Sequence, residues 1–245
     1  MTLVRSLIFN LIYLSWTIIF GILLMPTLLL SDNIVRQISR FYFKSLIILE
    51  KVILGLKYEL RGTKNLPKNT PFIVAMKHQS AWETLKLMIW FEHPVVILKK
   101  ELLHIPVWGW YAQKCGMIGI DRSSPINALN KTIHSTKKAL THGKVLVLFP
   151  EGTRVPINSK KTYKSGVIKL AQELQIPLIP AALNSGLYWP KNSFFKHSGT
   201  IIVEFLPAFN LTTTSDIKAL TKQLETQIET KTNELVKEGK HATKN

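Results

Sequence analysis

The chain has 245 residues, with 32 lysines and arginines against 15 aspartates and glutamates, and its formal net charge is +17. This excess predicts an anionic partner, and a hydrophobic content of 46% favours a lipid surface over nucleic acid. The single cysteine, Cys115, excludes an internal disulfide and a cysteine-based zinc site, and its apolar neighbours indicate a small buried side chain.

The first 56 residues are predicted to form a helical membrane anchor, followed by an α/β domain over residues 57–245. Residues 7–30 carry no charge. One helix of that length would span about 36 Å, which is enough to cross a hydrocarbon core of about 30 Å. Pro26 is expected to kink or end this helix.

A second apolar stretch, residues 34–56, carries Arg36, Arg40 and Lys44 at four-residue spacing. This pattern is typical of a basic amphipathic helix at a membrane interface. Two arrangements fit the two stretches: a spanning helix followed by a surface helix, or a helical hairpin that enters one leaflet. Because positive charge flanks both ends of the first stretch, the hairpin is favoured.

The run 72–76 is continuously apolar and is followed by Lys77 and His78. A short apolar run of this kind predicts a buried strand in a parallel sheet. Ligands of such sheets bind at the carboxyl ends of the strands. His78 is therefore expected at a ligand-binding edge.

Ser80 and Glu83 have the spacing of a capping box, which predicts a helix that starts at Ser80 and runs to about Phe91. His78 lies outside that helix and can fold back toward Glu83. A carboxylate at this position would orient the imidazole as a proton acceptor. The alternative is that Glu83 acts only as a helix cap.

Alternating strands and helices follow, and they predict a largely parallel central sheet with flanking helices. The aromatic segment 105–111 is expected to pack against the sheet, with the lipid interface as the alternative. A last helix is expected to start at Ser215 or Asp216, before a disordered polar tail at 237–245. The predicted strands are 94–98, 116–120, 144–149, 176–183 and 200–206, and the predicted helices include 127–142 and 164–174.

Three predicted strand ends carry chemically active side chains: His78 with Glu83, the Asp-Arg pair 121–122, and the Glu-Gly-Thr-Arg run 151–154. Because the carboxyl ends of parallel strands meet at one edge, a base and two guanidinium groups are expected to face one pocket. The guanidinium fork suits a phosphate group. Gly152 would let backbone N–H groups approach an anion closely.

At these residues the sequence resembles the glycerolipid acyltransferase family, over residues 72–183. The family has a histidine, four residues and an acidic residue where this chain has His78 to Glu83. The acidic residue is most often Asp in the family, so the contact between Glu83 and His78 must be arranged differently here. The other matching blocks are 119–122 (Gly-Ile-Asp-Arg), the highly specific 149–154 (Phe-Pro-Glu-Gly-Thr-Arg) and the proline-flanked strand 176–182.

The resemblance implies transfer of a fatty acyl group from an acyl thioester, acyl-CoA or acyl carrier protein, to the sn-2 hydroxyl of 1-acyl-sn-glycerol 3-phosphate (lysophosphatidic acid). The product would be phosphatidic acid. The resemblance implies four roles. His78 is the general base, Glu83 holds its imidazole, and Arg122 with Arg154 binds the glycerol phosphate. Glu151, Gly152 and Thr153 shape the acceptor site. From its charge at a strand end, Lys100 is a further candidate for substrate binding.

No metal or cofactor is expected besides the acyl thioester co-substrate. The expected partners are the membrane lipid bilayer, lysophosphatidic acid and the acyl donor, with no nucleic acid. The active site is expected to face the cytoplasm at the inner membrane, because acyl thioesters are made in the cytosol. Two alternatives stay open: the same chemistry on glycerol 3-phosphate or another lysolipid, and a non-catalytic membrane module that binds anionic lipid through Arg122 and Arg154.

Overall fold

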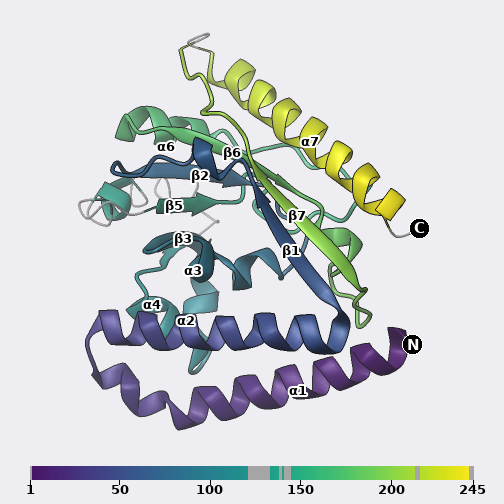
Figure 1. The fold of residues 1–245 in the computed structure, drawn as a ribbon. Coiled ribbons are helices and arrows are strands. Elements are labelled where there is room, and N and C mark those ends of the chain that lie inside the picture. Colours follow the sequence, from purple (N-terminus) through teal and green to yellow (C-terminus); the bar gives the residue numbers. More distant parts are fainter. Residues whose placement is uncertain (1, 121–132, 138–139, 141–144, 213–215, 243–245) are drawn as a thin grey trace.

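The structure is a computed structural model, and it describes residues 2–120, 133–137, 140, 145–212 and 216–242. Within these residues, strands form one sheet in the order β1-β7-β6-β2-β5-β3-β4 (Figure 1). Neighbouring strands run parallel except for the antiparallel pair of β6 and β7. The predicted α/β fold with a largely parallel sheet is confirmed.

Each strand predicted from the sequence is present, with ends shifted by one or two residues at most. The strands are β1 (Leu56–Arg61), β2 (Phe72–Met76), β3 (Pro94–Lys99), β4 (Ile118–Ile120), β5 (Val145–Leu148), β6 (Leu178–Leu183) and β7 (Gly199–Phe205). The described helices are α1 (Thr2–Leu23), α2 (Asp32–Leu49), α3 (Leu87–Trp90), α4 (Trp108–Lys114), α6 (Gly166–Leu174) and α7 (Ile217–Ala242).

The sheet is the middle of three layers, with α6 and α7 over one face and the α1–α2 hairpin on the other side (Figure 1). Side chains alternate between the two faces along β2, so that Val74 joins one hydrophobic core and Ala75 the other. Phe9 and Leu54 of the N-terminal segment belong to the first core. The N-terminal helices are therefore packed on the α/β domain.

The hairpin of α1 and α2 is joined by a 3₁₀ turn, Met25–Leu29, that contains Pro26 (Figure 1). Proline thus ends the first helix, as expected. Between the helices, the indole N–H of Trp16 donates a hydrogen bond to the hydroxyl of Ser45 at 2.8 Å. The hydroxyls of Thr17 and Tyr42 lie 2.7 Å apart.

The predicted helix from Ser80 to Phe91 is wrong. In its place a 3₁₀ turn, Glu83–Leu85, precedes the short helix α3. The hydrogen bonds of this turn run from residue i+3 to residue i, as from the N–H of Leu85 to the carbonyl of Trp82 at 3.1 Å. The segment is also anchored to the N-terminal part of the chain, where Glu50 accepts hydrogen bonds from Lys86 Nζ at 2.7 Å and from Trp82 Nε1 at 2.9 Å.

Three further expectations differ from the structure. Strand β1 was not predicted, although Leu56, Tyr58 and Leu60 alternate with charged residues. The aromatic segment does not bury its tryptophans in the core, because Trp108 and Trp110 are 44% and 45% exposed. Residues 237–242 are not disordered but continue α7, where Leu235, Val236 and Gly239 are buried.

Candidate active site

His78 follows β2 directly and is held through its backbone by the turn after β5. Its N–H donates a hydrogen bond to Glu151 Oε1 at 3.1 Å. Its carbonyl oxygen accepts one from the N–H of Val155 at 2.7 Å. The two most specific sequence blocks, 78–83 and 149–154, are therefore joined, one on each side of the histidine.

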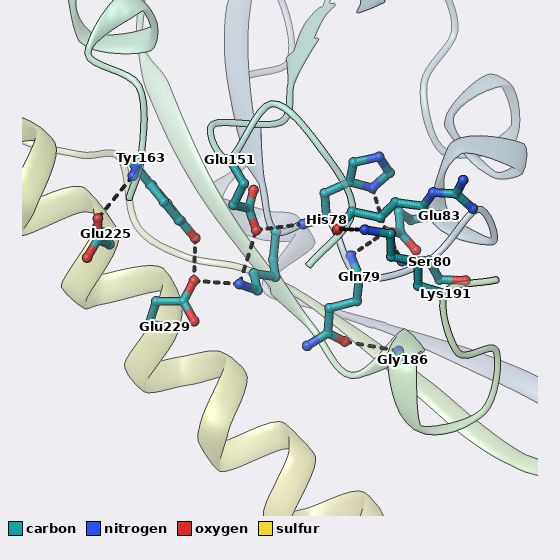
Figure 2. Close-up of polar contacts among 12 residues, drawn as sticks. His78, Gln79, Ser80, Glu83, Glu151, Tyr163, Gly186, Lys191, Glu225 and Glu229 are labelled. Carbon is teal, nitrogen blue, oxygen red and sulfur yellow. Dashed lines mark hydrogen bonds and ion pairs between the residues drawn. The ribbon is translucent and has the colours of Figure 1, made fainter. Parts of the chain in front are cut away.

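The imidazole of His78 contacts the buried carboxylate of Glu83, with Nδ1 and Oε1 2.9 Å apart (Figure 2). The same oxygen accepts hydrogen bonds from the N–H groups of Gln79 and Ser80, both at 2.8 Å. The other oxygen accepts one from the hydroxyl of Ser185 at 2.8 Å. Glu83 is therefore both a cap of the turn and a partner of the imidazole.

This arrangement determines which nitrogen of His78 can act as a base. An ionised carboxylate only accepts hydrogen bonds, so Nδ1 must carry the hydrogen that points at Glu83. The lone pair then lies on Nε2. The ring also stacks on Phe149, with centroids 4.0 Å apart, and its side chain is 13% exposed. A fixed, partly open imidazole of this kind is suited to accept a proton.

His78 lines a cavity of about 1460 Å³ that extends between the sheet edge and the α1–α2 hairpin. Its polar end includes Thr84, Thr153 and Arg154. The rest of the wall is mostly apolar and comes from α1, α2, β3 and α4; it includes Ile18, Phe20, Ile22, Phe43, Met88, Val107 and Leu102. The cavity thus joins a base and a guanidinium group to a long apolar volume.

Gly152 lies at the polar end of the cavity in a left-handed conformation, with φ of +69°. Beside it, the side chain of Lys164 passes so close that a Cβ on Gly152 would lie 3.1 Å from Lys164 Cε. The carbonyl of Arg154 accepts a hydrogen bond from Lys191 Nζ at 2.9 Å. The cations Lys99, Arg154, Lys164 and Lys169 all line the cavity, which makes it suitable for an anionic group.

Behind His78 lies a buried charged network that reaches α7 (Figure 2). Lys77 Nζ lies 3.1 Å from Glu151 Oε1 and 2.6 Å from Glu229 Oε1. The hydroxyl of Tyr163 donates to Glu229 at 2.9 Å. Burial raises the pKa of Glu151, and the neighbouring ammonium of Lys77 opposes that rise. The network fixes the backbone of His78 from the side away from the cavity.

The predicted site residues fall into three groups. His78, Gly152, Thr153 and Arg154 line the cavity, and Glu83 supports His78. Glu151 does not line the cavity, because its carboxylate is buried against Lys77, and the exposed Lys100 does not line it either; Lys99 takes that position. Arg122 lies outside the described residues.

Sequence reasoning missed the supporting residues. Lys77 was visible as a charge that interrupts an apolar run, and Glu50 as a lone acid in an apolar stretch. No spacing pattern links Ser185 to Glu83, or Glu229 to Lys77, since these pairs are 102 and 152 residues apart. Within the part of the chain that the structure describes, no three His, Cys, Asp or Glu side chains are grouped so that they could hold a metal ion.

Comparison with known proteins supports a single family. The sequence pattern of the acyltransferase family matches residues 57–184. A 1-acyl-sn-glycerol-3-phosphate acyltransferase of Pseudomonas aeruginosa is 38% identical over 175 residues, which cover 71% of this chain and 68% of that protein. A mouse 1-acyl-sn-glycerol-3-phosphate acyltransferase alpha is 29% identical over 213 residues, 85% of this chain and 74% of that protein.

The fold is also similar to a solved structure. The crystal structure of the 1-acyl-sn-glycerophosphate (LPA) acyltransferase PlsC from Thermotoga maritima matches with a TM-score of 0.75. The match covers 96% of this chain and 97% of that one, at 21% sequence identity. At this identity the likeness concerns the fold alone.

Proposed function

This chain belongs to the acyltransferase family, and we propose that it moves a fatty acyl group from an acyl thioester, acyl-CoA or acyl carrier protein, to the sn-2 hydroxyl of 1-acyl-sn-glycerol 3-phosphate. The product is phosphatidic acid. The observation that carries this proposal is the His78–Glu83 pair at the polar end of an apolar cavity that also contains Arg154. The names of the relatives support the choice of acceptor.

His78 acts as the general base in this proposal. Its Nε2 takes the proton of the sn-2 hydroxyl while the hydroxyl oxygen forms a bond to the thioester carbonyl carbon. The carbon–sulfur bond then breaks, and the imidazolium returns the proton to the leaving thiolate. Glu83 stabilises the imidazolium because its oxygen lies 2.9 Å from Nδ1.

No acyl-enzyme intermediate is required. Cys115 lines the cavity and is the thiol that could be considered for such a role. Burial raises the pKa of this thiol, so it stays protonated at neutral pH and is a weak nucleophile. Direct attack by the substrate hydroxyl on the thioester needs no such group.

Arg154 binds the phosphate of lysophosphatidic acid, together with Arg122. Lys164 lies beside Gly152 in the same cavity, so it adds a second cation to Arg154 at the polar end of the cavity. A guanidinium can donate two hydrogen bonds to one phosphate. The phosphate thereby orients the glycerol so that its free hydroxyl faces His78.

The apolar part of the cavity receives a fatty acyl chain. Burial of each CH₂ group is worth about 0.8 kcal/mol, so an acyl chain in this volume contributes many kcal/mol of binding. The wall includes residues of α1 and α2 such as Ile18 and Phe43. A lipid can therefore enter from the side of the N-terminal hairpin.

The N-terminal hairpin attaches the enzyme to one leaflet of a membrane. Among the described helices, α1 alone is long and apolar enough to cross a bilayer. Both of its ends are fastened to the α/β domain, however. Ser6 Oγ donates to the carbonyl of Lys196 at 3.3 Å, and Tyr111 OH donates to the carbonyl of Leu24 at 2.6 Å. These contacts support the hairpin over a spanning helix. In this proposal the active site faces the cytoplasm, because acyl thioesters are made there.

The decisive experiment is to incubate the purified protein in vesicles with labelled lysophosphatidic acid and acyl-CoA and to measure phosphatidic acid. His78→Ala is expected to lower the rate by about 10²- to 10⁴-fold, the usual contribution of a general base. His241→Ala, which removes an exposed histidine of α7, is the matched control. A preference for an acceptor without phosphate, or full activity of His78→Ala, would contradict the proposal.

A further inference from the structure

Two adjacent phenylalanines lie exposed in the loop between β6 and β7. Phe194 and Phe195 are 46% and 45% exposed. Their rings meet edge to face, with centroids 5.7 Å apart. A pair of large apolar side chains in contact with one another and open to the surroundings is a feature of interaction surfaces rather than of loops in general.

The loop is held firmly against the N-terminal half of α1. Asn10 Nδ2 donates a hydrogen bond to the carbonyl of Phe194 at 2.9 Å. One turn earlier on the same face of α1, Ser6 Oγ accepts one from the N–H of Lys196 at 2.9 Å. The ammonium of Lys196 closes the turn by donating to the carbonyls of Ser193 and Phe194. The exposure of the two rings is therefore built into the loop.

Next to these two bonded residues, the N-terminal part of α1 has an exposed apolar face. It includes Leu3, Leu7, Leu11 and Leu14. Because the loop carrying Phe194 is bonded directly to α1, the aromatic pair is held beside this helix.

The other end of α1 has a similar arrangement. There the exposed Trp108 and Trp110 lie on α4, and their neighbour Tyr111 bonds to the carbonyl of Leu24. Exposed Trp and Phe side chains on the apolar side of a helix are typical of a surface that lies in a membrane interface.

We propose that Phe194 and Phe195 insert into the same lipid leaflet as the exposed face of α1, as a second membrane contact formed by the α/β domain. This rests on the membrane attachment proposed above. A lipid leaflet fits the surface better than a protein partner, because residues 7–30 offer no charged residue for pairing while the chain as a whole carries +17. That charge favours a leaflet with anionic head groups.

The inference can be tested with a fluorescent depth probe on the full-length protein. In a Cys115→Ala background, Phe195→Cys is labelled with the environment-sensitive dye NBD and the protein is reconstituted into vesicles of phosphatidylethanolamine and phosphatidylglycerol. Leu14→Cys on α1 is the positive control. Lys222→Cys is the negative control, because Lys222 is exposed on α7, on the far side of the molecule from α1 (Figure 1).

The expected result is that spin-labelled lipids quench the probes at 195 and 14 severalfold more than the probe at 222. Quenching at 14 without quenching at 195 would overturn the second contact while leaving the attachment through α1 intact. Absence of quenching at 14 and 195 would overturn both. A probe at 195 that is shielded only as protein concentration rises, without lipid quenching, would indicate a second copy of the chain and would also overturn the inference.

Discussion

The carboxylate of Glu151 lies directly behind His78, and its Oε1 accepts the hydrogen bond of the His78 backbone N–H at 3.1 Å. Glu151 belongs to the most specific block of the sequence, yet it is buried and faces away from the cavity. Its contacts identify it as a support for the histidine rather than as a ligand of the acceptor. The two blocks therefore form one structural unit around the histidine.

Glu83→Gln is expected to lower kcat by up to about 10⁴-fold, the size of the effect when the acid of a serine-protease triad is made neutral. The amide keeps an acceptor oxygen for the N–H groups of Gln79 and Ser80, so the turn should persist. Ser185→Ala serves as the control, because it removes only the hydrogen bond to Glu83 Oε2, and it should lower kcat by about tenfold at most. The measurements are kcat and thermal unfolding; an unchanged kcat would mean that Glu83 only caps the turn.

Lys77→Met is expected to destabilise the fold by about 3–5 kcal/mol, because it leaves Glu151 and Glu229 as buried or half-buried charges without their cation. The double variant Lys77→Met/Glu229→Gln removes one of those charges and should recover part of the loss. Free energies of unfolding from denaturant titrations test this coupling. A free energy of unfolding of Lys77→Met within about 1 kcal/mol of the parent value, as is common for surface changes, would contradict the buried pairing of Lys77 with the two glutamates.

Glu151→Gln is expected to change how stability depends on pH. Burial raises the pKa of Glu151 above its ordinary value of 4.5 in the folded protein. The stability that Glu151 contributes is therefore complete below that ordinary value and is lost as pH rises through the raised pKa.

The test compares unfolding temperatures of the parent and of Glu151→Gln at a series of pH values from 4.5 to 8. The parent should lose stability relative to the variant as pH increases across this window, since the amide does not titrate. If the difference in unfolding temperature between the parent and Glu151→Gln stays constant, or if the parent becomes relatively more stable as pH rises, the raised pKa of Glu151 is contradicted.

Gly152→Ala is expected to lower the free energy of unfolding by about 1–2 kcal/mol and to weaken binding of the acceptor. The left-handed backbone at φ of +69° strains any residue with a Cβ, and the new methyl would press on Lys164. Gly166→Ala is the matched control, because a Cβ there meets nothing within 4 Å and helix α6 favours alanine. Unfolding and KM for lysophosphatidic acid are measured; equal effects of the two changes would argue against a special role of Gly152.

The sequence was informative where a local pattern determines the structure. Apolar runs gave the position of β2 to β7, and the five-residue spacing of His78 and Glu83 led to a contact that the structure contains. Ser215 or Asp216 was expected to cap the last helix, and Asp216 Oδ1 accepts a hydrogen bond from the N–H of Lys218 at 2.8 Å. Each of these depends on residues that are close in the chain.

The parts that could not be predicted depend on contacts between distant segments. Strand β7 runs antiparallel to β6, and its pairing with β1 brings together residues 143 positions apart, such as Leu56 and Gly199. Glu50 anchors the segment after Ser80 by accepting hydrogen bonds from Lys86 and Trp82, which lie 36 and 32 residues further along the chain. The exposure of Trp108 follows from the packing of α4 against α2 and the turn Met25–Leu29, which no periodicity within residues 105–111 indicates.

Residues 184–198 connect the antiparallel strands β6 and β7, and the two ends of this segment contact different parts of the protein. Ser185, at one end, bonds to the carboxylate that orients the imidazole, and Phe194, near the other, is fastened to α1. Exchange of this segment between homologous enzymes would thus alter turnover and lipid attachment together. A chimera made to change only one of the two properties should leave the first half of the segment as it is and graft the second half alone.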